Sequence, residues 1–479
     1  MKKIYQLILV FSIFANSFAQ QTYALKDNRN EVAGYAELVN INGKNDYYAT
    51  VAGYEFRPKD VKVVFQDINL NTINDVLLKF DVPVAHIGVY YNKNSVLIIA
   101  RDAKNRITID GMRYFIYDLK TNTLSAMQKF PAITIPGDVL GQIISVDGQG
   151  FIFQINNLKN KENISMYAMD NSGKKLWKEQ ISTNSGGKAK DFFTTMHQIE
   201  GNLLGVCYGD EEKSNIVKFS VMLINTTTGK EISRMKLDDE KNRYDPKTML
   251  FKNDKLYVFG DLYATGKKFE EDPMGFFMIE YDRTGKEIIR KNLPFSNLRS
   301  SLNIDKDGEV KSKGFIYTHE FLITEDAENI LLVGEYFKKM TVNDLVFLKF
   351  DKNFDFISSF EIKKVSNKAE LPYNSGGSKN LGGILKIYNY FDYEFSEKLD
   401  KNKGFGFFYK NITNDGTFVK TDYNFGIVSY QNETFKGETI KFDSKKPMDL
   451  LPSKPGYFLL FDYGDKNEMI NKRIEKVNY

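Results

Sequence analysis

Residues 150–181 read GFIFQINNLKNKENISMYAMDNSGKKLWKEQI, and this stretch decides the fold. Residues 151–156 alternate apolar and other side chains, as a β-strand does, and residues 165–169 and 176–181 are two further strand candidates. Residues 170–173, Asp-Asn-Ser-Gly, predict a turn, because Asp and Asn tolerate unusual backbone angles and Gly reaches positive φ without a Cβ clash. Three strands cannot bury their apolar face alone, so this unit must stack against others.

The second half of this stretch, a strand, a polar turn and a charged strand, recurs along the chain. Copies lie at residues 112–130, 220–237, 276–293 and 344–362, and a weaker copy lies at residues 61–80. A shorter apolar run precedes each copy, and one more strand precedes that run. Four strands at a period of roughly 50 to 60 residues predict the blades of a β-propeller.

The two ends of the chain differ from the repeats. Residues 20–46 contain two short strand candidates, whereas the last repeat, from Met448 onward, has three strands and then stops. We therefore expect an all-β propeller of about eight four-stranded blades, alternatively seven, whose ring is closed by an N-terminal strand that completes the last blade.

Residues 1–19 have the features of a signal peptide: Lys2 and Lys3, an apolar centre at 4–14 and the small-residue site Ser17-Phe18-Ala19. We expect residues 20–479 to form a single propeller domain that is exported to the periplasm, the cell surface or the medium. No later stretch approaches the roughly 20 apolar residues of a membrane span.

Charge and cysteine content narrow the possible partners and reactions. The chain has 66 Lys and Arg against 62 Asp and Glu, and two of the lysines belong to the leader. This balance gives no reason to expect nucleic acid as a partner, and we expect a monomer. Cys207, the single cysteine, cannot form an internal disulfide, and its apolar context predicts a buried small side chain rather than a catalytic thiol.

Three histidines, His86, His197 and His319, fall in the predicted innermost strands of alternate repeats. Imidazoles lining a central channel could bind a metal or carry protons. However, alternate blades hold their inner strands too far apart for the roughly 2 Å bonds of one zinc ion, so a structural role is favoured.

One segment matches half of a calcium loop. Asn303, Asp305, Asp307 and Gly308 have the required spacing, but Gly314 stands where the bidentate Glu belongs. The segment therefore predicts a solvated Asp-Gly turn, and we predict no metal and no cofactor for the chain.

Two connections share the sequence NSGG, at residues 184–187 and 374–377, and both follow the fourth strand of a repeat. Such connections gather on one face of a propeller, and surface loops commonly bind ligands. Together with the 294–316 connection, they make Asn184, Gly186, Asn374 and Gly376, with the three histidines, the candidate ligand-binding residues.

Residues 168–177, AMDNSGKKLW, resemble the tryptophan-docking repeat of quinoprotein-type propellers, at Ala168, Asp170, Gly173 and Trp177. The resemblance implies that the Trp packs against the neighbouring blade. It does not bring the quinone cofactor, because the paired cysteines of the enzymes are missing. The whole chain also resembles exported propeller-like proteins of unassigned function in Bacteroidota.

These observations predict an exported, non-catalytic propeller that binds a protein, peptide or glycan of the cell envelope through the NSGG face. On this prediction, trimming residues 363–380 abolishes binding and leaves thermal unfolding nearly unchanged. An alternative is an extracellular carbohydrate-active hydrolase or lyase with the histidines as acid or base. A structural envelope or adhesion component is the third possibility.

Overall fold

The computed structural model describes most of the chain from Thr22 onward, in segments. The described residues are 22–25, 34–40, 47–53, 59–67, 72–104, 109–130, 138–157, 163–182, 191–213, 216–265, 272–369, 378–399, 404–411, 413–414, 421–422, 424–441, 448–452, 457–463 and 468–476. The predicted signal peptide lies outside them.

Almost all described elements are strands. The first are β1 (Thr22–Leu25), β2 (Gly34–Asn40), β3 (Tyr47–Gly53), β4 (Asp60–Asp67), β5 (Thr72–Lys79), β6 (Val84–Tyr91), β7 (Ser95–Asp102), β8 (Met112–Asp118), β9 (Thr123–Leu124), β10 (Gln128–Lys129), β11 (Asp138–Val146), β12 (Gly150–Asn157), β13 (Asn163–Asp170), β14 (Lys175–Ser182), β15 (Asp191–Glu200), β16 (Leu203–Lys213), β17 (Ile216–Asn225) and β18 (Glu231–Lys236).

The chain continues with β19 (Asn242–Lys252), β20 (Lys255–Ala264), β21 (Gly275–Asp282), β22 (Glu287–Pro294), β23 (Glu309–Val310), β24 (Gly314–Ile323), β25 (Asn329–Lys338), β26 (Thr341–Asp351), β27 (Phe356–Ile362), β28 (Asn367–Lys368), β29 (Tyr393–Lys398), β30 (Gly404–Lys410), β31 (Thr413–Asn414), β32 (Thr421–Asp422), β33 (Asn424–Gln431), β34 (Thr434–Lys441), β35 (Met448–Pro452), β36 (Tyr457–Tyr463) and β37 (Glu468–Lys476). The helices among the described residues are the short 3₁₀ helix η1 (Ile109–Gly111) and the α-helices α2 (Phe295–Leu302) and α3 (Ser378–Ile387).

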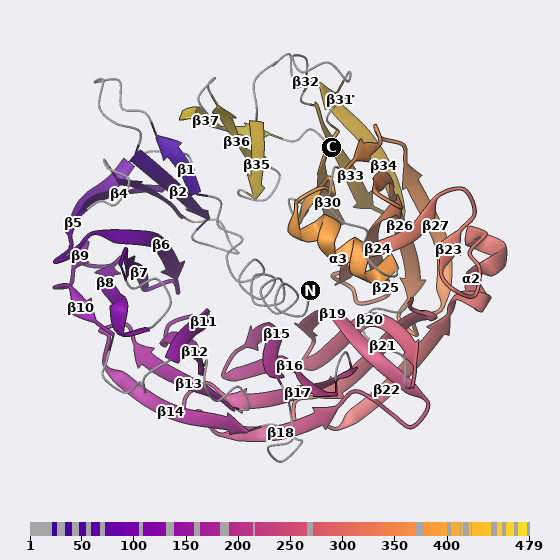
Figure 1. Ribbon diagram of the computed structural model, residues 1–479, viewed down its shortest axis with the longest axis horizontal. Helices are drawn as coiled ribbons and strands as arrows, with labels where there is room; N and C mark the ends of the chain where they lie inside the picture. The colour runs from indigo at the N-terminus through magenta and orange to yellow at the C-terminus, as the bar shows by residue number, and fades with distance from the viewer. Residues whose placement is uncertain are drawn as a thin grey trace.

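The strands form repeated antiparallel sheets. β11–β14, β15–β18 and β19–β22 each pair in chain order, and so do β6–β8 with β10, β24–β27, and β29, β30, β33 and β34. Figure 1 shows these sheets following one another around a ring, with β11, β15 and β19 toward the middle and β14, β18 and β22 at the rim. The sheets are the blades of a β-propeller, so the predicted all-β propeller fold is confirmed.

The two ends of the chain meet in one sheet. β1 pairs in parallel with β37 and antiparallel with β2, so that β35–β37, β1 and β2–β5 form a continuous eight-stranded sheet. The N-terminal strand therefore stands fourth after β35–β37, as the predicted ring closure requires. Because β1 also pairs with β2, the sheet does not show where the last blade ends and the first begins. The predicted number of blades, eight or alternatively seven, therefore stays a prediction.

The quoted turn has the predicted chemistry. One carboxylate oxygen of Asp170 accepts hydrogen bonds from the backbone N–H groups of Ser172 and Lys174. Asp282 makes the same bonds in the β21–β22 turn, and Asn225 makes a related pair in the β17–β18 turn. Each side chain satisfies donors that the reversing backbone leaves open, so the turn recurs from unit to unit.

Trp177 joins its own unit to the next one. Its indole Nε1 donates a hydrogen bond of 2.7 Å to the carbonyl oxygen of Thr226, and its ring lies on Gly229. A Cβ atom at Gly229 would stand 2.5 Å from the ring, so only glycine leaves room for it. The φ of this residue is +74°, a backbone conformation that also favours glycine. The neighbour packing that the tryptophan-docking resemblance implies is therefore confirmed at this interface.

The core fills the spaces between neighbouring sheets. Buried clusters combine residues of successive units; Phe130 of the β6–β10 unit, for example, meets Phe153 of the β11–β14 unit edge to face and also contacts the tilted ring of Tyr167. Cys207 is fully buried in such a cluster, among side chains of β17, β20 and β21, as predicted. In this part of the chain the aromatic residues serve mainly to pack blades together.

The outermost strands of four units each carry a β-bulge. The extra residue is apolar and about half exposed in each: Leu176, Ile232, Ile288 and Ile357. A bulge inserts one unpaired residue, which bends and twists the strand at that point.

Candidate functional site

Six of the first strands of the units also contain a bulge, and the residues at these bulges are mostly polar. The extra residue is His86 in β6, Thr195 in β15, Lys247 in β19, His319 in β24 and Glu394 in β29. In β11 the irregularity spans Gly141 and Gln142. Because a bulge re-aims a side chain, this device brings ionisable groups into the interior that strict alternation would not place there.

In three consecutive units the bulged residue pairs with a charged residue of the second strand. Lys247 lies 3.5 Å from Asp261, His319 lies 2.9 Å from Glu335, and Glu394 lies 2.8 Å from Lys410, measured between the charged atoms. The β19–β22, β24–β27 and β29–β34 units therefore share one internal arrangement of buried polar pairs.

The middle pair is the centre of a larger network, which we call the Glu335 cluster: His319, Glu335, Lys364 and Asp392. The imidazole Nε2 of His319 donates to one oxygen of Glu335, and the Lys364 ammonium lies 3.3 Å from the other and also contacts Asp392. The backbone N–H groups of Asp392 and Tyr393 donate to Glu335 at 3.0 to 3.2 Å. The carboxylate thus holds together β24, the connection after β27 and the start of β29.

Burial shapes the charges of this cluster. Burial raises the pKa of Asp392 to about 7, against the opposing effect of the Lys364 ammonium. Burial acts in the same direction on Glu335, but the hydrogen bond from His319 and the charge of Lys364 outweigh it and bring the pKa of this carboxyl below its ordinary value. The pKa of His319 falls to about 4, mainly because of burial and secondly because of Lys386. At neutral pH the imidazole is therefore uncharged.

Helix α3 covers the cluster. Leu385 of the helix is buried together with Phe337 and Phe391, and the ring of Phe391 stacks on Tyr317. The side chains of His319, Glu335, Lys364 and Asp392 are 2%, 0%, 0% and 6% exposed. A substrate cannot reach these groups in this structure, although acid, base and cation lie side by side.

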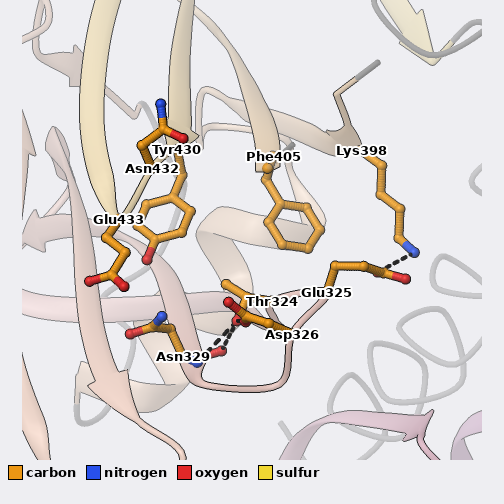
Figure 2. A pocket seen from close by; sticks show the side chains of 10 residues that line it. Thr324, Glu325, Asp326, Asn329, Lys398, Phe405, Tyr430, Asn432 and Glu433 are labelled. Carbon is orange, nitrogen blue, oxygen red and sulfur yellow. Dashed lines mark hydrogen bonds and ion pairs between the residues drawn. The ribbon is translucent and has the colours of Figure 1, made fainter. Parts of the chain in front are cut away.

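An open cavity of about 370 Å³ lies elsewhere, between the β24–β27 and β29–β34 units. It is lined by Thr324, Glu325, Asp326, Asn329, Lys398, Gly404, Phe405, Tyr430, Asn432 and Glu433. Figure 2 shows the rings of Phe405 and Tyr430 on one side of the cavity and Glu325, Asp326 and Asn329 on the other. We call it the inter-blade pocket.

The inter-blade pocket and helix α3 belong to opposite faces of the propeller. The pocket is built from the connections β24–β25, β29–β30 and β33–β34, whereas α3 lies in the connection between β27 and β29. In an antiparallel four-stranded unit, the turns after the first and third strands lie at one edge, and those after the second and fourth lie at the other. The pocket is therefore on the face away from α3.

Lysines accompany the carboxylates of the pocket. Glu325 lies 2.9 Å from the ammonium of Lys252 and 3.0 Å from that of Lys398, and Glu433 lies 3.3 Å from that of Lys349. The hydrogen bonds from Lys252 and Lys398 lower the pKa of Glu325. This carboxyl is therefore ionised at neutral pH.

The aromatic wall of the pocket carries one unsatisfied polar group. Phe405 and Tyr430 are 6% and 3% exposed and belong to one buried cluster. The hydroxyl of Tyr430 is buried, and no described group is within hydrogen-bond distance of it, although the Lys349 ammonium is near enough to lower its pKa against the effect of burial. A buried hydroxyl without a partner is unfavourable, so a ligand that reached it would gain a hydrogen bond.

The predicted histidines lie in first strands, as expected, but they do not come together. His197 of β15 donates from Nδ1 to the side-chain oxygen of Gln142, 2.9 Å away in the neighbouring unit, and burial lowers its pKa to about 4. His319 belongs to the Glu335 cluster, and the side chain of His86 lies outside the described part. No described contact joins one histidine to another.

The other predicted site residues have simpler outcomes. Asn184, Gly186, Asn374 and Gly376 all lie outside the described residues. Asp305 caps its own turn by accepting the backbone N–H groups of Asp307 and Glu309, as a solvated Asp-Gly turn would. Within the described ranges, no three His, Cys, Asp or Glu side chains are close enough together to hold a metal ion.

Comparisons with known proteins identify a family. No curated protein matches the chain. A quinohemoprotein alcohol dehydrogenase of Pseudomonas putida HK5 is similar in structure, with 10% identity, 92% of this chain and 71% of that chain covered, and a TM-score of 0.45. The WD40 domain of SCAP from fission yeast has 10% identity, 92% coverage of both chains and a TM-score of 0.44.

The β-propeller domain of the Trilobed protease from Pyrococcus furiosus has 10% identity, covers 71% of this chain and 99% of that chain, and has a TM-score of 0.36. Similarities at this level carry no conclusion about function, and the fold rests on the sheets described above. No helix among the described residues is long and apolar enough to cross a membrane. Residues 60–341 and 333–478 match the model of a family of unknown function, DUF6770, and the chain belongs to this family.

Proposed function

We propose that the protein is an exported, non-catalytic β-propeller that binds a protein, peptide or glycan of the cell envelope in the inter-blade pocket. The observation that carries this proposal is the pocket itself, a cavity of about 370 Å³ between two blades with aromatic, amide and charged groups in its wall. Ligand sites are typically such concave places, with an apolar wall and a few polar groups that orient the ligand.

The charged groups of the molecule favour binding over catalysis. The Glu335 cluster has acid, base and cation in contact, but α3 and its neighbours exclude a substrate from it. In the pocket, Lys252 and Lys398 hold the pKa of Glu325 below its usual range. A general acid for glycosidic bond cleavage needs the opposite shift.

The proposed site differs from the one expected from sequence. The 294–316 connection forms helix α2, which buries Phe295, Leu298 and Leu302 against the neighbouring sheets. The 363–380 connection contributes Lys364 to the Glu335 cluster. These described parts of the two connections stabilise the fold. We therefore place the ligand on the other face, where the inter-blade pocket lies.

Native mass spectrometry of the protein, recovered gently from its own cell envelope, tests the proposal. Lys398→Trp places a bulky ring at the pocket wall, and Lys352→Trp is the matched control, because both lysines are exposed and pair with a glutamate at 3.0 Å. We expect a bound species with the wild type and with Lys352→Trp, and its loss with Lys398→Trp. A species that persists in Lys398→Trp argues against the pocket.

The same spectra test export. The mass of the recovered chain is expected to correspond to a start near Gln20. A chain that retains residues 1–19 contradicts the signal-peptide prediction.

A further inference from the structure

We infer that the inter-blade pocket takes a short, uncharged carbohydrate unit, such as one or two sugar residues. This inference rests on the proposed function and names the ligand class of the same site. Its basis is the combination of balanced charge, hydrogen-bonding groups of both kinds and an aromatic wall.

The charges around the pocket cancel. Three carboxylates line or border it, those of Glu325, Asp326 and Glu433, and three ammonium groups stand against them. The three lysines are Lys252, Lys349 and Lys398. A charged ligand would find no uncompensated opposite charge here and would gain little from ion pairs that are largely exposed. An uncharged ligand loses nothing by this.

The polar groups suit hydroxyls. A sugar hydroxyl both donates and accepts, and the wall offers carboxylate acceptors, the Lys398 ammonium as a donor and two side-chain amides, Asn329 and Asn432, that can do either. No described group lies within hydrogen-bond distance of the buried hydroxyl of Tyr430, although the Lys349 ammonium is close enough to act on its pKa. A ligand hydroxyl at this place would satisfy it.

The aromatic wall suits the other side of a sugar. The C–H groups of a pyranose ring form an apolar face, and Phe405 and Tyr430, which are 6% and 3% exposed, offer a small apolar area on one side of the cavity while Glu325 and Asp326 lie opposite (Figure 2). The volume, about 370 Å³, is near the lower end of the roughly 300–1,000 Å³ usual for small-ligand pockets. Both features favour a short unit over a long chain in an open groove.

Titration calorimetry with the mature protein tests this assignment. The neutral probes are lactose, cellobiose, maltose and di-N-acetylchitobiose, and the charged probes are digalacturonic acid and trilysine. We expect at least one neutral disaccharide to bind, and its affinity to change less than twofold between about 50 and about 500 mM NaCl, because no net charge is involved.

Three variants locate the binding. Lys398→Trp is expected to weaken it at least tenfold, whereas the control Lys352→Trp leaves it unchanged. Tyr430→Phe removes only the buried hydroxyl and is expected to weaken binding by about three- to tenfold, the effect of one hydrogen bond.

The outcomes separate the inference from the proposed function. If a charged probe binds more tightly than every neutral one and Lys398→Trp abolishes this, the ligand class is wrong and the pocket is still the site. Failure of all four neutral disaccharides to bind also overturns the inference, as does binding that Lys398→Trp leaves intact. If in addition native mass spectrometry finds nothing attached, the proposed function fails as well.

Discussion

Replacing Lys364 by Met tests how the propeller holds the connection between β27 and β29. The substitution keeps most of the side-chain volume and removes the ammonium that lies between Glu335, at 3.3 Å, and Asp392. All three side chains are almost completely buried. Two carboxyl groups would then face each other without the cation between them.

The magnitude follows from this burial. Removing one partner of a buried ion pair costs about 3–5 kcal/mol, because the other charge stays buried without compensation. Such a loss is a large part of the roughly 5–15 kcal/mol by which proteins are normally stable. The exposed pair of Lys352 and Glu328, both 58% exposed, provides the control, and Lys352→Met should cost less than about 1 kcal/mol.

The pH dependence gives a second test. The Lys364 ammonium stabilises the ionised form of Asp392, whose pKa is about 7 in the folded protein. The stability difference between wild type and Lys364→Met should therefore be largest near pH 8 and shrink as the pH falls through about 7. It should not vanish by about pH 5, because the pKa of Glu335 lies below its ordinary value and this carboxylate is still ionised there.

Urea unfolding followed by circular dichroism measures these differences. A loss of less than about 1 kcal/mol for Lys364→Met at pH 8, or a difference that grows toward acid pH, would refute our account of the Glu335 cluster. The same account argues against the expectation that residues 363–380 can be trimmed without effect on unfolding, because Lys364 and the start of α3 would be lost.

Further predictions concern Trp177, Gly229 and His197. Trp177→Ala should lower stability by about 3–5 kcal/mol in urea unfolding, through the lost ring and its hydrogen bond to the next unit. Gly229→Ala should cost at least about 1 kcal/mol by the same measurement, because φ is +74° and the new Cβ would meet the Trp177 ring, whereas the exposed Asn353→Ala should cost far less. His197 has a folded pKa of about 4, below its ordinary value of 6.5, so the wild type should lose up to about 1.4 kcal/mol per pH unit from this group as the pH falls from about 6.5 to about 4. His197→Gln should remove that part of the dependence, and an unchanged pH profile would show that the imidazole is not buried in its neutral form.

Much of the fold can be predicted from the sequence because its determinants are local. Strand periodicity, the Asp170–Gly173 turn and the spacing to Trp177 are read within a few residues, and the structure has them as expected. The placement of His197 and His319 in first strands follows from the same repeats.

The charged interior could not be predicted in this way. His319 and Glu335 meet because a bulge turns one residue of β24, and nothing in the local pattern announces a bulge. Lys364 and Asp392 reach Glu335 from two other segments. One sequence feature does point to the acidic partners of these pairs. The apolar runs of the second strands end in a small residue followed by an acidic one, as in Gly260-Asp261 and Gly334-Glu335.

The inter-blade pocket was missed for a related reason. Its wall combines turns that are about a hundred residues apart in sequence, and only the ring arrangement brings residues 324–329 beside residues 430–433. Each turn alone has an ordinary polar composition. Sites between repeats therefore require the assembled propeller.

The bulges at Leu176, Ile232, Ile288 and Ile357 have a consequence for how copies of the protein can stand next to one another. A propeller exposes the outer margin of every blade, and a straight margin would invite another chain to add itself as a fifth strand. A kink in each of these margins breaks the row of donors and acceptors that such an addition needs. Many copies could then stand next to one another without aggregating edge to edge. A partner that binds by strand addition would find no straight strand edge on these four blades.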